Sequence, residues 1–260
     1  MFDADAFQAL RRGHWGASLE WHPSIESTQD ALRDRLRHMG VETGAIIGAE
    51  EQSAGRGRWG RHWEGQAGKS LLFTVAVPIA DLRGNLGPAP LVLGVGLQRA
   101  LSGLGLDGLA LRWPNDLCWN GRKLAGLLVE QDGGQLLIGL GLNVAQEMDA
   151  FSEELQAKAG SLKLAGLKEL RRERLLAAVL RAWEDAWAQW QSEGFEPLRK
   201  AWEEVAEGRE GALLKVQPTS GAPWEGHWAG LDSSGALKIR PSEGLIRLLS
   251  SGEVQRLHYA

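Results

Sequence analysis

The most informative part of the chain is a twelve-residue stretch, Gln52-Ser-Ala-Gly-Arg-Gly-Arg-Trp-Gly-Arg-His-Trp63. It holds three arginines, Arg56, Arg58 and Arg61, and no acidic residue. Glycines let the backbone approach a ligand closely, and a guanidinium group can bind a phosphate or carboxylate with two hydrogen bonds. The stretch is also too long for a simple connector inside a compact domain. It predicts an anion-binding loop, with a solvated basic turn as the alternative. We call residues Gln52–Trp63 the arginine loop.

Hydrophobic periodicity on both sides of this loop predicts an α+β fold, with more antiparallel than doubly wound character. Residues 1–20 are expected to form a short helical lead-in, and Asn120-Gly121 marks a two-residue hairpin turn within 117–129. After Gly208 the chain changes to short strands between Gly, Ser and Pro turns. We therefore predict two domains, 1–208 and 209–260, the second small and all-β. The other expected strands are 44–50, 69–77, 109–113 and 135–144, and the other expected helices are 27–38, 87–101, 167–190 and 196–207.

Composition excludes several classes of protein. The 260 residues are 43% hydrophobic and 24% charged, which is typical of a globular protein, and the net charge of −4 disfavours bulk binding of nucleic acid. Cys118 is the only cysteine, so there is neither an internal disulfide nor a multi-cysteine metal site, and a reducing cytoplasm is expected. No apolar run has the length of a membrane span, and the six histidines have no metal-ligand spacing. We expect no protein-held metal site.

A second group of polar residues follows the strand expected at 109–113. In Arg112-Trp-Pro-Asn-Asp-Leu117 the proline ends that strand, and Asn115 and Asp116 follow directly after its end. The Asn-Gly hairpin then returns the chain so that Lys123 can lie near Asp116. A lysine and a carboxylate beside an anion-binding loop suit a reaction that stabilises negative charge and positions an amine. The alternative is an ordinary surface ion pair.

A third segment, Gly139-Leu-Gly-Leu-Asn143-Val, is a glycine-containing strand that ends in an amide, for which close packing is the alternative explanation. Taken in order, the three segments resemble the biotin protein ligases. The resemblance also includes Ser27-Thr28-Gln29, Lys123–Gly126 and the tail segments around Gly230 and Ser251. It implies a mixed or antiparallel sheet flanked by helices, as in class II synthetases, followed by a small SH3-like β-barrel.

The resemblance implies a two-step ligase that uses ATP, Mg²⁺ and biotin. Biotin and ATP would form biotinyl-5′-adenylate, and a lysine of the biotin carboxyl carrier domain of a carboxylase, such as acetyl-CoA carboxylase, would then displace AMP. Arg56 and Lys123 are expected to neutralise the reacting anions, and Asp116 to orient and deprotonate the acceptor amine. By position, the biotin-binding residues are Ser27, Thr28, Gln29, Gln52, Gly55, Arg56 and Lys123, and the nucleotide-binding residues are Arg58, Arg61, Trp63, Asn115 and Asn143. Arg58 and Arg61 would hold the adenylate phosphate, and Trp63 would close over it.

Some positions depart from the family pattern, and three alternatives stay open. Gln29 replaces the common Asn, Arg112 replaces the common Lys, and Leu71-Leu72 stands in the expected wall of the biotin site. The alternatives are a ligase for another acyl acid such as lipoate, a biotin-responsive repressor, and an inactive biotin-binding protein. The stretch before Ser27 is short for a helix-turn-helix module, so we expect the monofunctional type, without DNA binding or membrane association. The family also implies that a homodimer can form.

Overall fold

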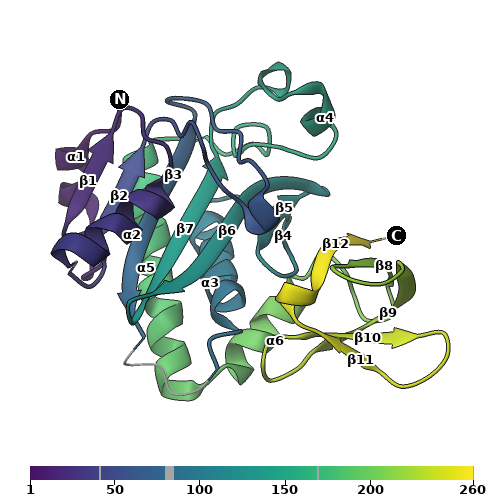
Figure 1. The fold of residues 1–260 in the computed structure, drawn as a ribbon. Coiled ribbons are helices and arrows are strands. Elements are labelled where there is room, and N and C mark those ends of the chain that lie inside the picture. Colours follow the sequence, from purple (N-terminus) through teal and green to yellow (C-terminus); the bar gives the residue numbers. More distant parts are fainter. Residues whose placement is uncertain (41, 80–84, 169, 260) are drawn as a thin grey trace.

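A seven-stranded mixed sheet forms the centre of the protein (Figure 1), which we describe from a computed structural model for residues 1–40, 42–79, 85–168 and 170–259. Each neighbouring pair of strands is antiparallel except β1 and β2, which run parallel. The predicted α+β class with a mixed sheet is thus confirmed. In spatial order the strands are β1 (Leu19–His22), β2 (Ile46–Ala49), β3 (Ser70–Pro78), β7 (Gln135–Asn143), β6 (Arg122–Asp132), β5 (Asp116–Trp119) and β4 (Leu109–Arg112).

Helices cover the two faces of this sheet unequally. In Figure 1, α2 lies in front of the sheet, and α3 and α5 lie behind it and pack against each other. Side chains of β7 alternate accordingly: Leu136 and Ile138 enter the main core, whereas Leu137 joins a small cluster with Leu32 of α2. The helices are α1 (Ala4–Leu10), α2 (Thr28–Met39), α3 (Ala89–Gly103), α4 (Glu153–Gln156), α5 (Arg172–Glu193) and α6 (Glu196–Glu204). The short α2 leaves part of the front face uncovered by helix.

Local signals explain where several elements begin and end. The Ser27 hydroxyl accepts a hydrogen bond from the Asp30 N–H and so caps the first turn of α2, and Gly40 ends the helix with a positive φ of 69°. Asn120 and Gly121 have φ angles of 47° and 73°, as a two-residue hairpin of mirror-image type requires. The predicted hairpin between β5 and β6 is confirmed.

The C-terminal residues form a second, five-stranded antiparallel sheet, which confirms the predicted all-β segment. The hydrophobic core runs on from the first sheet into this one, because Trp202 of α6 stacks on Trp228 at a centroid distance of 5.8 Å. The Trp113 indole also donates to the Gly235 carbonyl at 3.1 Å. The strands, in spatial order, are β11 (Arg247–Leu249), β10 (Leu237–Pro241), β9 (Trp224–Leu231), β8 (Leu213–Pro218) and β12 (Val254–Tyr259).

Two expectations about the elements were wrong. Only Ala4–Leu10 of the lead-in is helical, and β1 was not predicted, because its alternation covers only four residues and the strand depends on pairing with β2. The long helix begins at Arg172 and not at Leu167; the turn Lys163–Gly166 precedes it. No helix within the described ranges is long and apolar enough to cross a membrane.

Candidate active site

A cavity of about 740 Å³ opens on the front face of the seven-stranded sheet, beside α2. Its walls come from the start of α2, the arginine loop, the β5–β6 hairpin, β7 and the C-terminal strand β12. The structure therefore brings together segments that are far apart in the sequence. Twelve of the thirteen residues predicted for the site line this cavity: Ser27, Thr28, Gln29, Gln52, Arg56, Arg58, Arg61, Trp63, Asn115, Asp116, Lys123 and Asn143.

Gly55 is the predicted site residue that the cavity lining does not include. Its carbonyl accepts a hydrogen bond from the Trp63 N–H at 2.9 Å, which closes the arginine loop at its base. A Cβ atom at this position would lie 3.1 Å from both the Trp63 carbonyl oxygen and the Gln52 side chain. The glycine lets the two ends of the loop approach each other.

A buried polar network connects α2 with the sheet at the inner end of the cavity. The Gln52 Oε1 accepts from the Thr28 N–H at 2.7 Å and from the Thr28 hydroxyl at 3.0 Å. The hydroxyls of Thr28 and Thr74 lie 2.9 Å apart, and Thr74 also donates to Gln29 at 3.1 Å. Gln29 in turn donates to the Leu137 carbonyl. The side chains predicted to bind biotin are thus held in fixed orientations by one another.

Thr74 belongs to this network and was not predicted. It is the only hydroxyl between Leu71 and Val77, and a single polar residue in a buried strand is the signal that could have identified it.

Glycines on the front face of the sheet leave room for Trp63 to lie flat against the strands. A Cβ atom at Gly141 would be 2.4 Å from the Trp63 ring, and one at Gly126 would be 3.2 Å from it. The Trp63 indole N–H is buried and makes no hydrogen bond within the part of the chain that the structure describes. It is a donor that a ligand can satisfy. Gly141 therefore does more than allow close strand packing.

Lys123 and Asp116 form an ion pair with an Nζ–Oδ1 distance of 2.7 Å inside the cavity. Their side chains are 32% and 19% exposed, so the pair is more shielded than an ordinary surface pair. The backbone of Lys123 is held by Lys158 and Gly160, through N–H···O bonds of 2.7 and 2.9 Å. The Lys123 ammonium also lies 5.3 Å from the centre of the Trp63 ring. The predicted proximity of Lys123 and Asp116 is confirmed.

Arg56 lies at the mouth of the cavity, away from this pair. Its guanidinium contacts Asp30 at 2.5 Å, and Glu130 at 3.7 Å, in a cluster that also includes Arg33. The structure therefore brings the two predicted anion-neutralising residues into one cavity but pairs each with its own carboxylate. Asp30 was not predicted, since nothing in its spacing shows that the loop folds back over α2.

Arg58 points from the arginine loop to the C-terminal sheet, where it donates a hydrogen bond to the Ser251 carbonyl. Burial lowers the pKa of the Arg58 guanidinium, and the nearby Asp116 opposes this shift. An arginine still stays charged at neutral pH, so Arg58 contributes a partly desolvated positive charge to the cavity.

The amides of Asn115 and Asn143 are both engaged with the protein. Asn115 donates to the Leu127 carbonyl, and Asn143, only 4% exposed, donates to the Gly160 carbonyl at 3.0 Å and accepts from Gln146 at 3.2 Å. Asn143 thus ties β7 to the segment that holds Lys123. Direct binding of a nucleotide by these two amides stays a prediction.

Arg112, which replaces the lysine common in the family, connects separate segments of the structure. Its guanidinium binds both oxygens of Glu207, just beyond α6, and also donates to the Gly121 carbonyl. Although burial acts in the opposite direction, the hydrogen bond to Glu207 raises the pKa of Arg112. This bidentate geometry suits arginine better than lysine.

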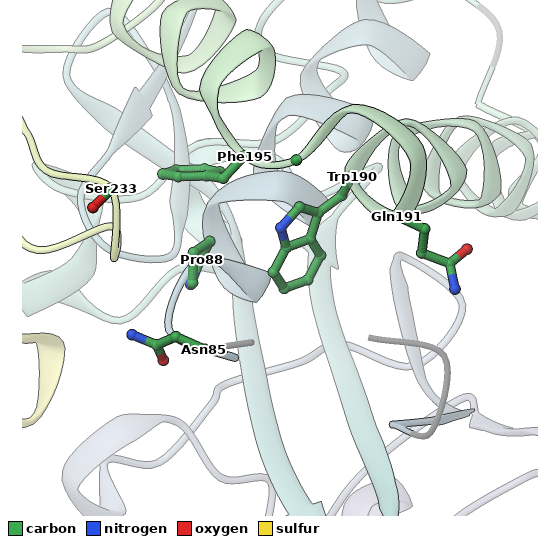
Figure 2. A pocket seen from close by; sticks show the side chains of 7 residues that line it. Asn85, Pro88, Trp190, Gln191, Phe195 and Ser233 are labelled. Atoms are coloured by element: carbon green, nitrogen blue, oxygen red, sulfur yellow. The ribbon is translucent and has the colours of Figure 1, made fainter. Parts of the chain in front are cut away.

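A second cavity, of about 320 Å³, lies between the end of α5, the start of α6 and the turn before α3 (Figure 2). It is lined by uncharged residues: Asn85, Pro88, Trp190, Gln191, Gly194, Phe195 and Ser233. Without a charged group it offers no acid, base or anion-binding side chain. The predicted chemistry therefore belongs to the larger cavity.

Comparison with known proteins gives consistent results. Residues 21–144 match the model of the biotin/lipoate A/B protein ligase family. The chain is 32% identical to the bifunctional ligase/repressor BirA of Escherichia coli, over 92% of this chain and 74% of that protein. It is 34% identical to the biotin–[acetyl-CoA-carboxylase] ligase of Paracoccus denitrificans, over 79% of this chain and 88% of that one.

Among solved structures, the biotin protein ligase from Aquifex aeolicus in complex with biotin and ATP is similar, with a TM-score of 0.82 and 28% identity. The match covers 94% of this chain and all of that one. Sequence, cavity and overall structure agree, and the chain belongs to the biotin protein ligase family.

Proposed function

We propose that this protein is an ATP-dependent biotin ligase, which makes biotinyl-5′-adenylate and transfers the biotinyl group to a lysine of a carrier domain. The observation that carries the proposal is the Lys123–Asp116 pair, set in one cavity with the arginine loop. The Paracoccus relative is named a biotin–[acetyl-CoA-carboxylase] ligase, and the Aquifex ligase was solved in complex with biotin and ATP. The reaction has two steps, and residues of this chain take part in each.

In the first step, an oxygen of the biotin carboxylate attacks the α-phosphorus of ATP, and the bond to pyrophosphate breaks. Two anions must approach each other, so their repulsion has to be offset by positive charge that is already in place. Lys123 supplies such charge from within the cavity and Arg56 supplies it from the mouth, whereas Arg58 is proposed to hold the phosphate of the adenylate once it has formed. No enzyme nucleophile is needed, because the carboxylate itself attacks.

In the second step, the neutral amine of the carrier lysine attacks the acyl carbon, and AMP leaves. The amine has to lose a proton, and Asp116 is the carboxylate best placed to orient it and accept that proton. Its partner Lys123 holds the Asp116 carboxylate in place, with Nζ 2.7 Å from Oδ1.

The buried network of Gln52, Thr28 and Thr74 supports biotin as the carboxylic acid that the enzyme activates. The bicyclic head of biotin carries a polar ureido group on an otherwise apolar frame. It needs both donors and acceptors at the inner end of a pocket, which hydroxyl and amide side chains provide.

Magnesium is part of the proposal as the partner of ATP. Mg²⁺ usually keeps several waters and takes one or two carboxylates together with substrate phosphates. No group of three metal-binding side chains comes together within the described ranges, but Glu64 and Glu154 line the cavity in addition to the paired Asp116 and Glu207. These residues fit an ion held mainly by phosphate and water, which would screen the phosphate charges.

The acceptor is proposed to be a biotin carboxyl carrier domain, as the name of the Paracoccus relative suggests. We also propose a division near residue 208, a cytoplasmic location consistent with the single cysteine, no DNA binding, and homodimer formation. Size-exclusion chromatography with light scattering, with and without biotin and ATP, tests the last point.

The test of the function is ATP-dependent transfer of biotin to a purified carrier domain. Pyrophosphate release and a mass increase of the carrier should both require biotin and ATP, and a carrier whose acceptor lysine is replaced by arginine should gain no mass. Uptake of lipoate but not biotin would instead identify a ligase for that acid. Binding of biotin without pyrophosphate release would identify an inactive binding protein.

A further inference from the structure

Trp59, in the middle of the arginine loop, contacts the C-terminal sheet. Its indole N–H donates to the Val254 carbonyl at 3.1 Å, across 195 residues of sequence. The preceding Arg58 donates to the Ser251 carbonyl. Two consecutive loop residues thus bind two carbonyls at one turn of the other sheet, and this pair of contacts ties the middle of the loop to that sheet.

The backbone at Trp59 is strained. Its φ of 61° lies in the left-handed region, which a bulky residue rarely adopts. Its side chain is 48% exposed, so burial of the ring does not account for the conformation. Such a conformation persists where surrounding contacts hold it, and the hydrogen bond to Val254 is the contact that fits.

The turn that presents the two carbonyls is itself well supported. In the 3₁₀ turn η3 (Ser251–Glu253), the Glu253 carboxylate accepts from the Ser250 N–H at 2.7 Å, and a reciprocal cap is present. The Glu253 carbonyl accepts from the N–H of Thr219, just beyond β8, at 2.9 Å. The loop therefore rests on a rigid turn.

We infer that Trp59 is a positioning residue that anchors the arginine loop to the C-terminal sheet and so keeps the loop closed over the intermediate. Arg58 and Arg61 lie on either side of this anchor, so its loss would loosen both cations at once. The C-terminal sheet would then serve the reaction by holding the loop, in addition to lining the cavity with Val254, Leu257 and His258. This inference rests on the proposed function for its intermediate, but not for the anchor itself.

The first test needs no activity. Arg56, Arg58 and Arg61 make the loop a substrate for trypsin once it opens. Trp59→Phe keeps a ring but removes the N–H donor, and should raise the rate of cleavage within the loop about two- to tenfold, as expected for loss of one hydrogen bond. The matched control is Trp224→Phe in β9, where the ring contacts Arg247 and not the loop. It should be cleaved like the unaltered protein.

The second test alters the turn of the C-terminal sheet that the loop contacts. Glu253→Ala removes the cap of the turn and should increase cleavage of the loop to a similar extent. Because both changes break the same connection between the loop and the C-terminal sheet, the double variant should be cleaved no faster than the more sensitive single variant. Additive effects, or a Trp59→Phe loop cleaved at the control rate, would overturn the anchor.

The third test links the anchor to the reaction. Trp59→Phe should form biotinyl-adenylate at a rate within about twofold of normal but release it into solution about two- to tenfold faster. Released adenylate is measured by the nonspecific biotinylation of an added bystander protein. If the unaltered protein forms no adenylate, the proposed function fails while the protease tests still decide the anchor. If Trp59→Phe opens the loop but retains its adenylate, the anchor has no role in the reaction.

Discussion

Replacing Gly141 by alanine tests whether Trp63 is the platform for the nucleotide. The added methyl group would lie 2.4 Å from Cε2 of Trp63 and 2.8 Å from two further ring atoms. Ordinary contact between carbon atoms begins near 3.5 Å, so the indole has to move by about 1 Å. Gly141 lies in β7 without a positive φ, so an alanine can adopt its backbone conformation and the sheet should stay intact.

A displacement of about 1 Å at a group that positions a substrate can reduce the rate of reaction by up to about a hundredfold. We expect the KM for ATP to rise by about ten- to a hundredfold, which corresponds to about 1.4–2.7 kcal/mol of binding free energy. Biotin should still bind with an affinity within about threefold of normal, because its polar network at Thr28 and Gln52 does not contact Gly141.

The assay is pyrophosphate release over a range of ATP concentrations, with biotin binding measured separately by calorimetry. Gly139→Ala is the contrasting variant: it lies two residues earlier on the same face, but its methyl group would meet the Gln29 side chain at 2.7 Å. It should weaken biotin binding more than ATP binding. Gly103→Ala, with no atom within 4 Å of the new methyl group, is the neutral control. If Gly141→Ala keeps the KM for ATP within about twofold, Trp63 does not bind the nucleotide.

Four further predictions concern charged residues. Lys123→Ala should slow adenylate formation by about a hundredfold or more, measured as single-turnover pyrophosphate release, because the reacting anions lose a preorganised cation; a normal rate would exclude its catalytic role. Arg58→Gly should instead form adenylate but leak it, seen as indiscriminate biotinylation of lysines, and retention equal to that of the unaltered protein would contradict the role of the loop. Glu50→Ala should reduce the free energy of unfolding in urea by about 3–5 kcal/mol, because it leaves Arg172, 8% exposed, without its buried partner; a loss below about 1 kcal/mol would show that the pair is not coupled. Burial alone would raise the pKa of Glu50, but hydrogen bonds from Arg172 and the Phe2 N–H lower it, so its contribution to stability is present above the unfolded pKa of about 4.3 and is lost as the pH falls through the folded value. Glu50→Gln should therefore flatten the loss of stability on acidification.

Local signals in the sequence were sufficient for much of the fold. The Ser27 cap, the Asn120-Gly121 turn and the apolar run of β7 act over a few residues, and each produced the expected element. By contrast, the alternation of β1 covers only four residues, and the strand depends on its pairing with β2. A short strand at a sheet edge is decided by its partner, which single-sequence reasoning does not include.

In the candidate site, too, some contacts follow from local sequence signals and others depend on distant segments. Lys123 and Asp116 were predicted to meet because a two-residue hairpin fixes the register between their strands. The pairing of Arg56 with Asp30 was not predicted, because it depends on the path of the arginine loop across α2. A long side chain at the mouth of a cavity takes its partner from whichever element is packed nearby.

The sequence by itself determined which groups the reaction can use: a loop of glycines and arginines, a lysine with a carboxylate, and hydroxyls at the start of a helix. Only the tertiary structure decided how these groups are held. Thr74 enters the inner network, glycines at 126 and 141 make room for Trp63, and a turn of the C-terminal sheet meets the loop 195 residues away. The physical reason is the range of the interactions. Capping, turn formation and strand alternation are settled within a few residues, whereas packing across a cavity depends on where the chain returns.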